Sequence, residues 1–109
     1  MKTPSKGTKK RACNANVHKL IWRDVVCHVR HTPNYISNGW SHIEITVLKP
    51  TGAPLPITTT GYRSHFLDVE VLIAAGGPVA FFRDWIEREA YTKQWAKTEF
   101  KWRQLELFP

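Results

Sequence analysis

The residues with the greatest potential for chemistry are Arg63, Ser64 and His65, which follow one another in a polar segment. An arginine can bind a phosphate or a carboxylate through two parallel hydrogen bonds. A serine and a histidine act as nucleophile and base only where they meet in space, which adjacency in the sequence does not arrange. In the alternative, Arg63 and His65 bind backbone carbonyl groups, while Tyr62 and Phe66 anchor a helix to a sheet. We favour this structural role, assign no catalytic residue and predict that the protein is not an enzyme.

A metal site is the next possibility, because the chain has five histidines and two cysteines. The densest group is Cys27, His28 and His31. Consecutive side chains of a strand point to opposite faces, so Cys27 and His28 cannot hold one ion there. Structural zinc sites normally show four well-spaced ligands, and the sequence has no paired CxxC and no HExxH. We therefore predict no metal and no cofactor, and free thiols at both cysteines.

Basic residues are concentrated at the N-terminus. Sixteen Lys and Arg residues against nine Asp and Glu residues give a net charge of +7. Positions 1–11 contain no acid and five of the basic residues: Lys2, Lys6, Lys9, Lys10 and Arg11. Such an arm can bind the phosphate backbone of DNA without sequence preference. The alternative is a solvated, disordered terminus, which this composition also fits and which we favour.

A second basic group lies near the other end of the chain. Three lysines recur there at four-residue intervals with aromatic residues between them: Lys93, Trp95, Lys97, Phe100, Lys101 and Trp102. A basic stripe beside aromatic rings can bind nucleic acid through phosphate contacts and base stacking. The alternative, which we favour, is an amphipathic helix with its lysines in water and its aromatic residues in the core.

The elements that position these residues have an α+β pattern, with the strands first. Residues 25–29 and 43–47 alternate between apolar and polar side chains, as half-buried strands do. Asn38-Gly39 favours a two-residue hairpin turn before the second of them. A third strand is expected from Leu55 to Thr60, where the flanking Pro54 and Pro56 restrict it to a sheet edge. We predict an antiparallel three-stranded meander followed by two or three helices packed on one face.

The helices are expected after Gly61. Asp68 can cap a short helix that ends near Ala75, and Pro78 suits the first turn of a longer helix. Thr92 can cap a last helix that reaches about Arg103. The longest apolar stretch, residues 69–82, is interrupted at 76–78 and too short to cross a bilayer. We therefore expect a cytoplasmic protein without a membrane partner.

The chain ends in Gln104-Leu105-Glu106-Leu107-Phe108-Pro109. Residues 104–108 resemble the pentapeptide by which bacterial proteins bind the DNA polymerase sliding clamp, which reads Gln-Leu, a small or acidic residue, Leu, Phe. The resemblance implies that the contacts are made by four residues, with Glu106 at the tolerant position: Gln104, Leu105, Leu107 and Phe108. The rival interpretation is that Leu105 and Phe108 finish the last helix and pack on the domain.

The body of the chain resembles a group of small bacterial proteins that often occur on mobile elements. The resemblance spans roughly residues 22–108 and is carried by three stretches: residues 39–45, residues 54–58 with 61–66, and residues 76–80. It implies a bacterial or mobile-element source and no particular activity.

Together these features predict a basic tail at 1–16, a single α+β domain at 17–103 and a docking peptide at 104–109. The leading hypothesis is a non-enzymatic accessory or regulatory protein at DNA that binds the sliding clamp, or another protein, through this peptide. One alternative is a phage or plasmid anti-defence inhibitor, similar to an anti-CRISPR protein, that binds a host nucleoprotein. The other is a small enzyme that uses Arg63, Ser64 and His65.

Overall fold

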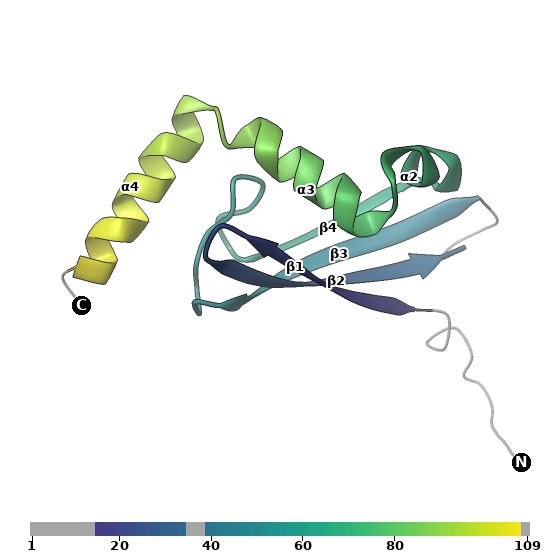
Figure 1. Ribbon diagram of the computed structural model, residues 1–109, viewed down its shortest axis with the longest axis horizontal. Coiled ribbons are helices and arrows are strands. Elements are labelled where there is room, and N and C mark those ends of the chain that lie inside the picture. Colours follow the sequence, from purple (N-terminus) through teal and green to yellow (C-terminus); the bar gives the residue numbers. More distant parts are fainter. Residues whose placement is uncertain (1–14, 35–38, 108–109) are drawn as a thin grey trace, which may run out of the picture.

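The computed structural model describes residues 15–34 and 39–107, with the backbone alone for 106 and 107. These residues form one antiparallel sheet of four strands in chain order and three helices (Figure 1). The strands are β1 (Asn16–Trp22), β2 (Val25–Pro33), β3 (Trp40–Lys49) and β4 (Tyr62–Asp68). The helices are α2 (Val69–Ala75), α3 (Pro78–Glu89) and α4 (Lys93–Leu107). The predicted α+β class is confirmed.

The strand prediction was wrong at three places. β1, which begins at Asn16, and β4, which follows Gly61 where only helices were expected, were not predicted. The third predicted strand at Leu55–Thr60 does not form. Leu55 and Thr58 instead make an isolated bridge, with Leu55 N donating to Thr58 O at 2.7 Å. Pro54 and Pro56 lack backbone N–H groups, so this segment cannot supply a continuous ladder. Its buried side chains Leu55 and Ile57 fill the core instead.

The connection between β2 and β3 also differs from the expected two-residue turn. The last pair of the ladder joins Pro33 to Ser41, so the connection is longer. Gly39 has a φ of 90°, a conformation that residues with a Cβ adopt at a cost. Asn38 lies outside the described residues.

The two faces of the sheet differ because α2 and α3 lie on one side of it, while α4 extends past one end of the sheet (Figure 1). α3 contacts β1 and β2, while α2 contacts β3 and β4. The side chains on this covered face include Leu20, Cys27, Val29, Ile43 and Ile45, all fully buried. Phe82 and Ile86 of α3 are also fully buried and complete the core. The opposite side of the sheet, which we call the open face, carries none of the helices formed by the described residues.

The predicted helix signals are confirmed. Asp68 accepts a hydrogen bond from Glu70 N at 2.8 Å at the start of α2, and Gly76 ends that helix with a φ of 97°. Pro78 stands in the first turn of α3. Thr92 Oγ1 accepts from Trp95 N at 3.2 Å where α4 begins. α4 continues to Leu107 instead of ending near Arg103.

None of the helices within residues 15–34 and 39–107 has the length and apolar character that a membrane span requires.

Candidate functional site

The alternation of β4 separates the three residues that were considered for catalysis. Arg63 and His65 pair with Ile45 and Ile43, so they share the covered face with the core. Ser64 pairs with Glu44 and lies on the open face. The strand therefore does not bring Ser64 and His65 together, and a serine–histidine pair needs that contact.

Arg63 packs at the edge of the core. Its guanidinium donates from Nη1 to the carbonyl oxygen of Ile57 at 3.0 Å and lies 4.8 Å from the centre of the Trp85 ring. The hydrogen bond fixes the buried 53–57 segment, and the ring contact fixes α3. These contacts agree with a structural role for Arg63.

His65 is enclosed by rings of α3. Its imidazole stacks on Phe81, with ring centres 5.6 Å apart, and meets Trp85 edge-on at 5.2 Å. Burial lowers the pKa of His65, and the nearby Arg63 charge lowers it further. Arg63 and His65 thus hold the helix, whereas Tyr62 and Phe66 lie on the open face. The expectation that Tyr62 and Phe66 anchor a helix was wrong.

The residues considered for a metal are also separated. Cys27 is fully buried on the covered face, and His28 lies on the open face, as the strand alternation predicts. Burial raises the pKa of the Cys27 thiol to about 11. His31 Nε2 is 3.1 Å from Ser41 Oγ. Within the described ranges, no group of three or more His, Cys, Asp or Glu side chains could hold a metal ion.

Helix α4 carries the lysine stripe, and Lys93, Lys97 and Lys101 are all exposed. The aromatic residues beside them differ in burial, because Trp95 is 6% exposed and Phe100 is 66% exposed. A shallow groove runs along this helix and is lined by Gln94, Lys97, Thr98, Phe100, Lys101 and Gln104. Phe100 is therefore the aromatic ring that the stripe presents to solvent.

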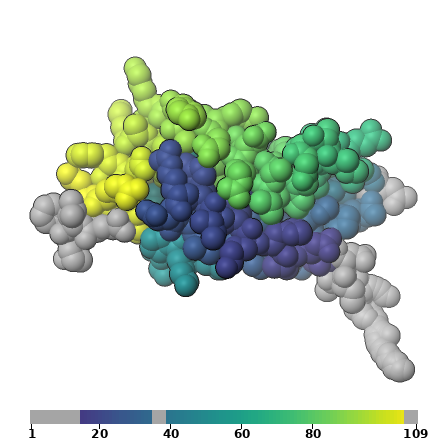
Figure 2. Space-filling model, viewed as in Figure 1, coloured from purple at the N-terminus to yellow at the C-terminus, as the bar shows by residue number. Residues whose placement is uncertain are grey.

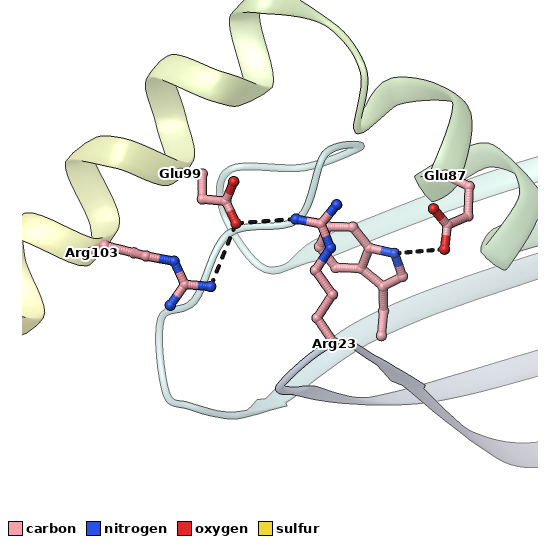
Figure 3. A network of polar contacts seen from close by, with 5 residues as sticks. Arg23, Glu87, Glu99 and Arg103 are labelled. Carbon is pink, nitrogen blue, oxygen red and sulfur yellow. Dashed lines mark hydrogen bonds and ion pairs between the residues drawn. The ribbon is translucent and has the colours of Figure 1, made fainter.

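Two contacts attach α4 to the β1–β2 hairpin, which lies beside it (Figure 2). The Trp95 ring meets Trp22 edge-on, with ring centres 5.7 Å apart. Glu99 accepts from Arg23 at 3.2 Å and from Arg103 at 3.5 Å (Figure 3). Trp22 Nε1 donates to Glu87 of α3 at 3.1 Å, so this tryptophan contacts both helices (Figure 3).

The end of α4 carries the first part of the predicted docking peptide. Gln104 is exposed, and Leu105 is 64% exposed, so most of the Leu105 side chain faces solvent. Leu107 is the last helical residue. Phe108 lies outside the described residues, as do the tail residues Lys2, Lys6, Lys9, Lys10 and Arg11.

The open face carries a set of exposed rings that the sequence did not single out. Trp40, Tyr62 and Phe66 are 46%, 47% and 44% exposed. The Tyr62 hydroxyl donates to Glu44 at 2.9 Å, and this hydrogen bond is the main cause of the raised pKa of Tyr62. His42 stacks against Phe66 with ring centres 4.4 Å apart. Only the strand register could have revealed this set, because Trp40 lies on a different strand.

Comparison with known proteins gives one family. A family model described as the KlcB third domain matches residues 15–95, from the start of β1 to the first turn of α4. The chain belongs to this family. Neither a curated protein nor a solved structure matches the chain.

The matched KlcB third domain includes all three stretches that resemble small mobile-element proteins, and it is consistent with a protein of that type. Arg63, His65 and the open-face rings Trp40 and Tyr62 also belong to the KlcB third domain. Most of α4 and the whole of residues 104–109 lie beyond it.

Proposed function

We propose that the protein is a non-enzymatic accessory or regulatory factor at DNA that binds the DNA polymerase sliding clamp through Gln104, Leu105, Leu107 and Phe108. The observation that carries the proposal is the exposure of Leu105, which is 64% at the free end of α4. An apolar side chain in this position gains on the order of 1.5–3 kcal/mol when an apolar groove removes it from water.

The attachment of α4 supports the proposal in a second way. The described contacts of this helix with the body, through Trp95 and Glu99, all precede residue 104. Gln104 and Leu105 are both exposed, so a partner can reach them without displacing those contacts, and the last carbonyl groups of a helix lack intrahelical partners. A clamp could thus bind the segment as a helix or after its last turn unwinds, at a small cost in either case.

DNA association would come from the basic residues. The lysine stripe on α4, Lys93, Lys97 and Lys101, is exposed on the helix that carries the peptide. The arm at residues 1–11 adds five positive charges at the other end of the chain. Both can contact phosphates without sequence preference, so their contribution should fall steeply with salt.

The test measures binding of the purified full chain to a purified bacterial sliding clamp by calorimetry. The variant combines Leu105→Ala with Phe108→Ala. Its matched control combines Val71→Ala with Ile73→Ala, because these α2 side chains are also exposed, at 52% and 70%. We expect the first variant to lose most of the affinity and the control to retain it.

A synthetic peptide of residues 104–109 provides an independent arm, since it should compete with the full chain for the clamp. The proposal is wrong if the full chain does not bind the clamp, or if both double variants bind it equally well.

A further inference from the structure

We propose that the open face of the sheet binds single-stranded nucleic acid, with bases stacked on the rings of Trp40 and Tyr62. This inference goes beyond clamp docking, because it concerns a different surface and a different class of partner. It depends on neither Leu105 nor Phe108.

The first support is the placement of the rings. Trp40 and Tyr62 stand on adjacent strands, β3 and β4, and both are about half exposed on the open face. Tyr62 pairs with Thr46, so the two rings are separated along β3 by the six residue steps from position 40 to position 46. At about 3.3 Å per residue this is roughly 20 Å, which leaves room for several nucleotides between the rings. Strands hold the rings in fixed positions, and every base offers a flat face for stacking.

The second support is the polar group that lies between the rings. Arg30 pairs with Glu44, and Glu44 pairs with Ser64, so these residues form one row across the open face. Lys19 and His28 lie in the neighbouring row, which also holds Tyr62, so they lie at the Tyr62 end of the open face. Arginine, lysine and serine side chains supply hydrogen-bond donors for phosphates and base edges.

The same polar row argues against a protein partner. Stable protein interfaces have an apolar centre and a polar rim. This face has the reverse arrangement, because Arg30 and Glu44 lie centrally while the half-exposed rings Trp40 and Tyr62 lie towards its ends. A dry interface would have to desolvate the carboxylate of Glu44, which also accepts a hydrogen bond from the Tyr62 hydroxyl. Interfaces with nucleic acids are wet and keep such groups hydrated.

Charge complementarity supports the same partner. The chain has a net charge of +7, and the five positive charges of residues 1–11 precede β1, an edge strand of this sheet. Arg11 is five residues from Asn16, a separation that a chain can extend to at most about 18 Å. A strand of phosphates that crosses the open face would therefore lie within reach of this arm.

The experiment measures the fluorescence anisotropy of labelled oligonucleotides of about 15 nucleotides on addition of the full chain. A DNA strand of thymines, an RNA strand of uracils and a duplex of the same length are compared over a range of salt concentrations. Comparison of the DNA strand with the RNA strand shows which of the two nucleic acids the protein binds more tightly. We expect the single strands to bind more tightly than the duplex, because duplex bases are already stacked.

The decisive variants are Trp40→Ile and Tyr62→Ile, each of which removes a ring and keeps a residue that favours strands. Each should weaken single-strand binding about five-fold or more. Tyr62→Phe should bind like the parent, because the ring remains while the bond to Glu44 is lost. The matched control is Tyr91→Ile, since Tyr91 is 86% exposed and lies between α3 and α4, outside the strands.

Circular dichroism of each variant separates a lost ring from a lost fold. If Trp40→Ile does not fold, the comparison of Tyr62→Ile with Tyr62→Phe remains decisive. Clamp binding of Tyr62→Ile should be unchanged, and oligonucleotide binding of the Leu105→Ala, Phe108→Ala variant should be unchanged. The experiments can therefore refute clamp binding without refuting nucleic-acid binding, and the reverse.

The inference is overturned if the folded isoleucine variants bind single strands as Tyr91→Ile does, or if Tyr62→Phe loses binding as Tyr62→Ile does. It is equally overturned if the parent binds no single strand. A dimer that Trp40→Ile and Tyr62→Ile convert to a monomer, with oligonucleotide binding unchanged, would identify the open face as a contact between copies.

Discussion

The covered and open faces of the sheet are built from the same four strands, yet they contain different kinds of residues. On the covered face, Ile43 and Ile45 are fully buried beneath helices, and even Arg63 and His65 are held by contacts with α3 and the 53–57 segment. On the open face, Trp40 and Tyr62 remain about half exposed around the Arg30–Glu44 pair. Burial on one side supplies stability, whereas exposure on the other side leaves groups available to a partner.

The largest expected effect comes from removing the central ring of the covered side. Phe82 is fully buried in the core, so Phe82→Ala should lower the free energy of unfolding by about 3–5 kcal/mol. Tyr62→Ile on the open face should lower it by less than about 1 kcal/mol. Urea denaturation measures the free energy of unfolding of both variants. Similar decreases in the two would mean that the open face contributes as much to stability as the covered face does.

A polar atom placed in the core should have the next largest effect. Cys27→Ser replaces a fully buried thiol with a hydroxyl that needs a hydrogen-bond partner, and it should cost about 1–3 kcal/mol of stability. His28→Ser, one position along on the open face, should cost less than about 1 kcal/mol. Thermal unfolding of the two variants measures the contrast, which disappears if Cys27 is in fact accessible to water.

The two arginines on opposite faces provide a finer comparison. Arg63→Ala removes the hydrogen bond to Ile57 and the ring contact with Trp85, and it should cost about 1–2 kcal/mol of unfolding free energy. Arg30→Ala should leave stability within about 0.5 kcal/mol of the parent and weaken oligonucleotide binding. If Arg63→Ala is as stable as the parent, Arg63 does not stabilise the fold, and a role in ligand binding is open again.

The sequence predicted those parts of the molecule whose signals are local. Residues 25–29 and 43–47 alternate clearly, and Asp68, Gly76, Pro78 and Thr92 mark helix ends through their own backbone chemistry. β4 was missed because Arg63 and His65 occupy positions on its covered face where apolar residues are usual. Its sequence therefore lacks the alternation of polar and apolar residues that marks a half-buried strand. Arg63 and His65 stabilise the fold through contacts with Trp85 and Phe81, which are distant in the sequence.

The candidate sites, too, could be predicted only where their signals are local in the sequence. The lysine stripe could be placed from helical spacing alone. The exposure of Leu105 could not, because packing of that side chain on the domain fitted the sequence as well. The open-face rings could not, because Trp40 and Tyr62 become neighbours on one surface only through the pairing of β3 with β4. β1 was also hidden, since this edge strand has exposed apolar residues, Val17 and Ile21, on the face that usually carries polar ones.

The smallest expected effect is a dependence of stability on pH that belongs to the covered face. Burial and then Arg63 lower the pKa of His65 below its ordinary value of 6.5, so the folded state favours the neutral ring. The stability from this group is present above pH 6.5 and is lost as the pH falls through the lowered pKa. His31, whose pKa burial and His18 also lower, acts in the same direction.

His65→Gln, which does not titrate, should therefore reduce the loss of stability between about pH 7.5 and about pH 5 without abolishing it, since His31 remains. Urea denaturation at the two pH values measures this slope, and His28→Gln on the open face is the matched control. The covered face is the source of the pH dependence only if His65→Gln flattens the slope more than His28→Gln does. Equal slopes in the two variants would show that the rings of Phe81 and Trp85 do not shield His65 from water.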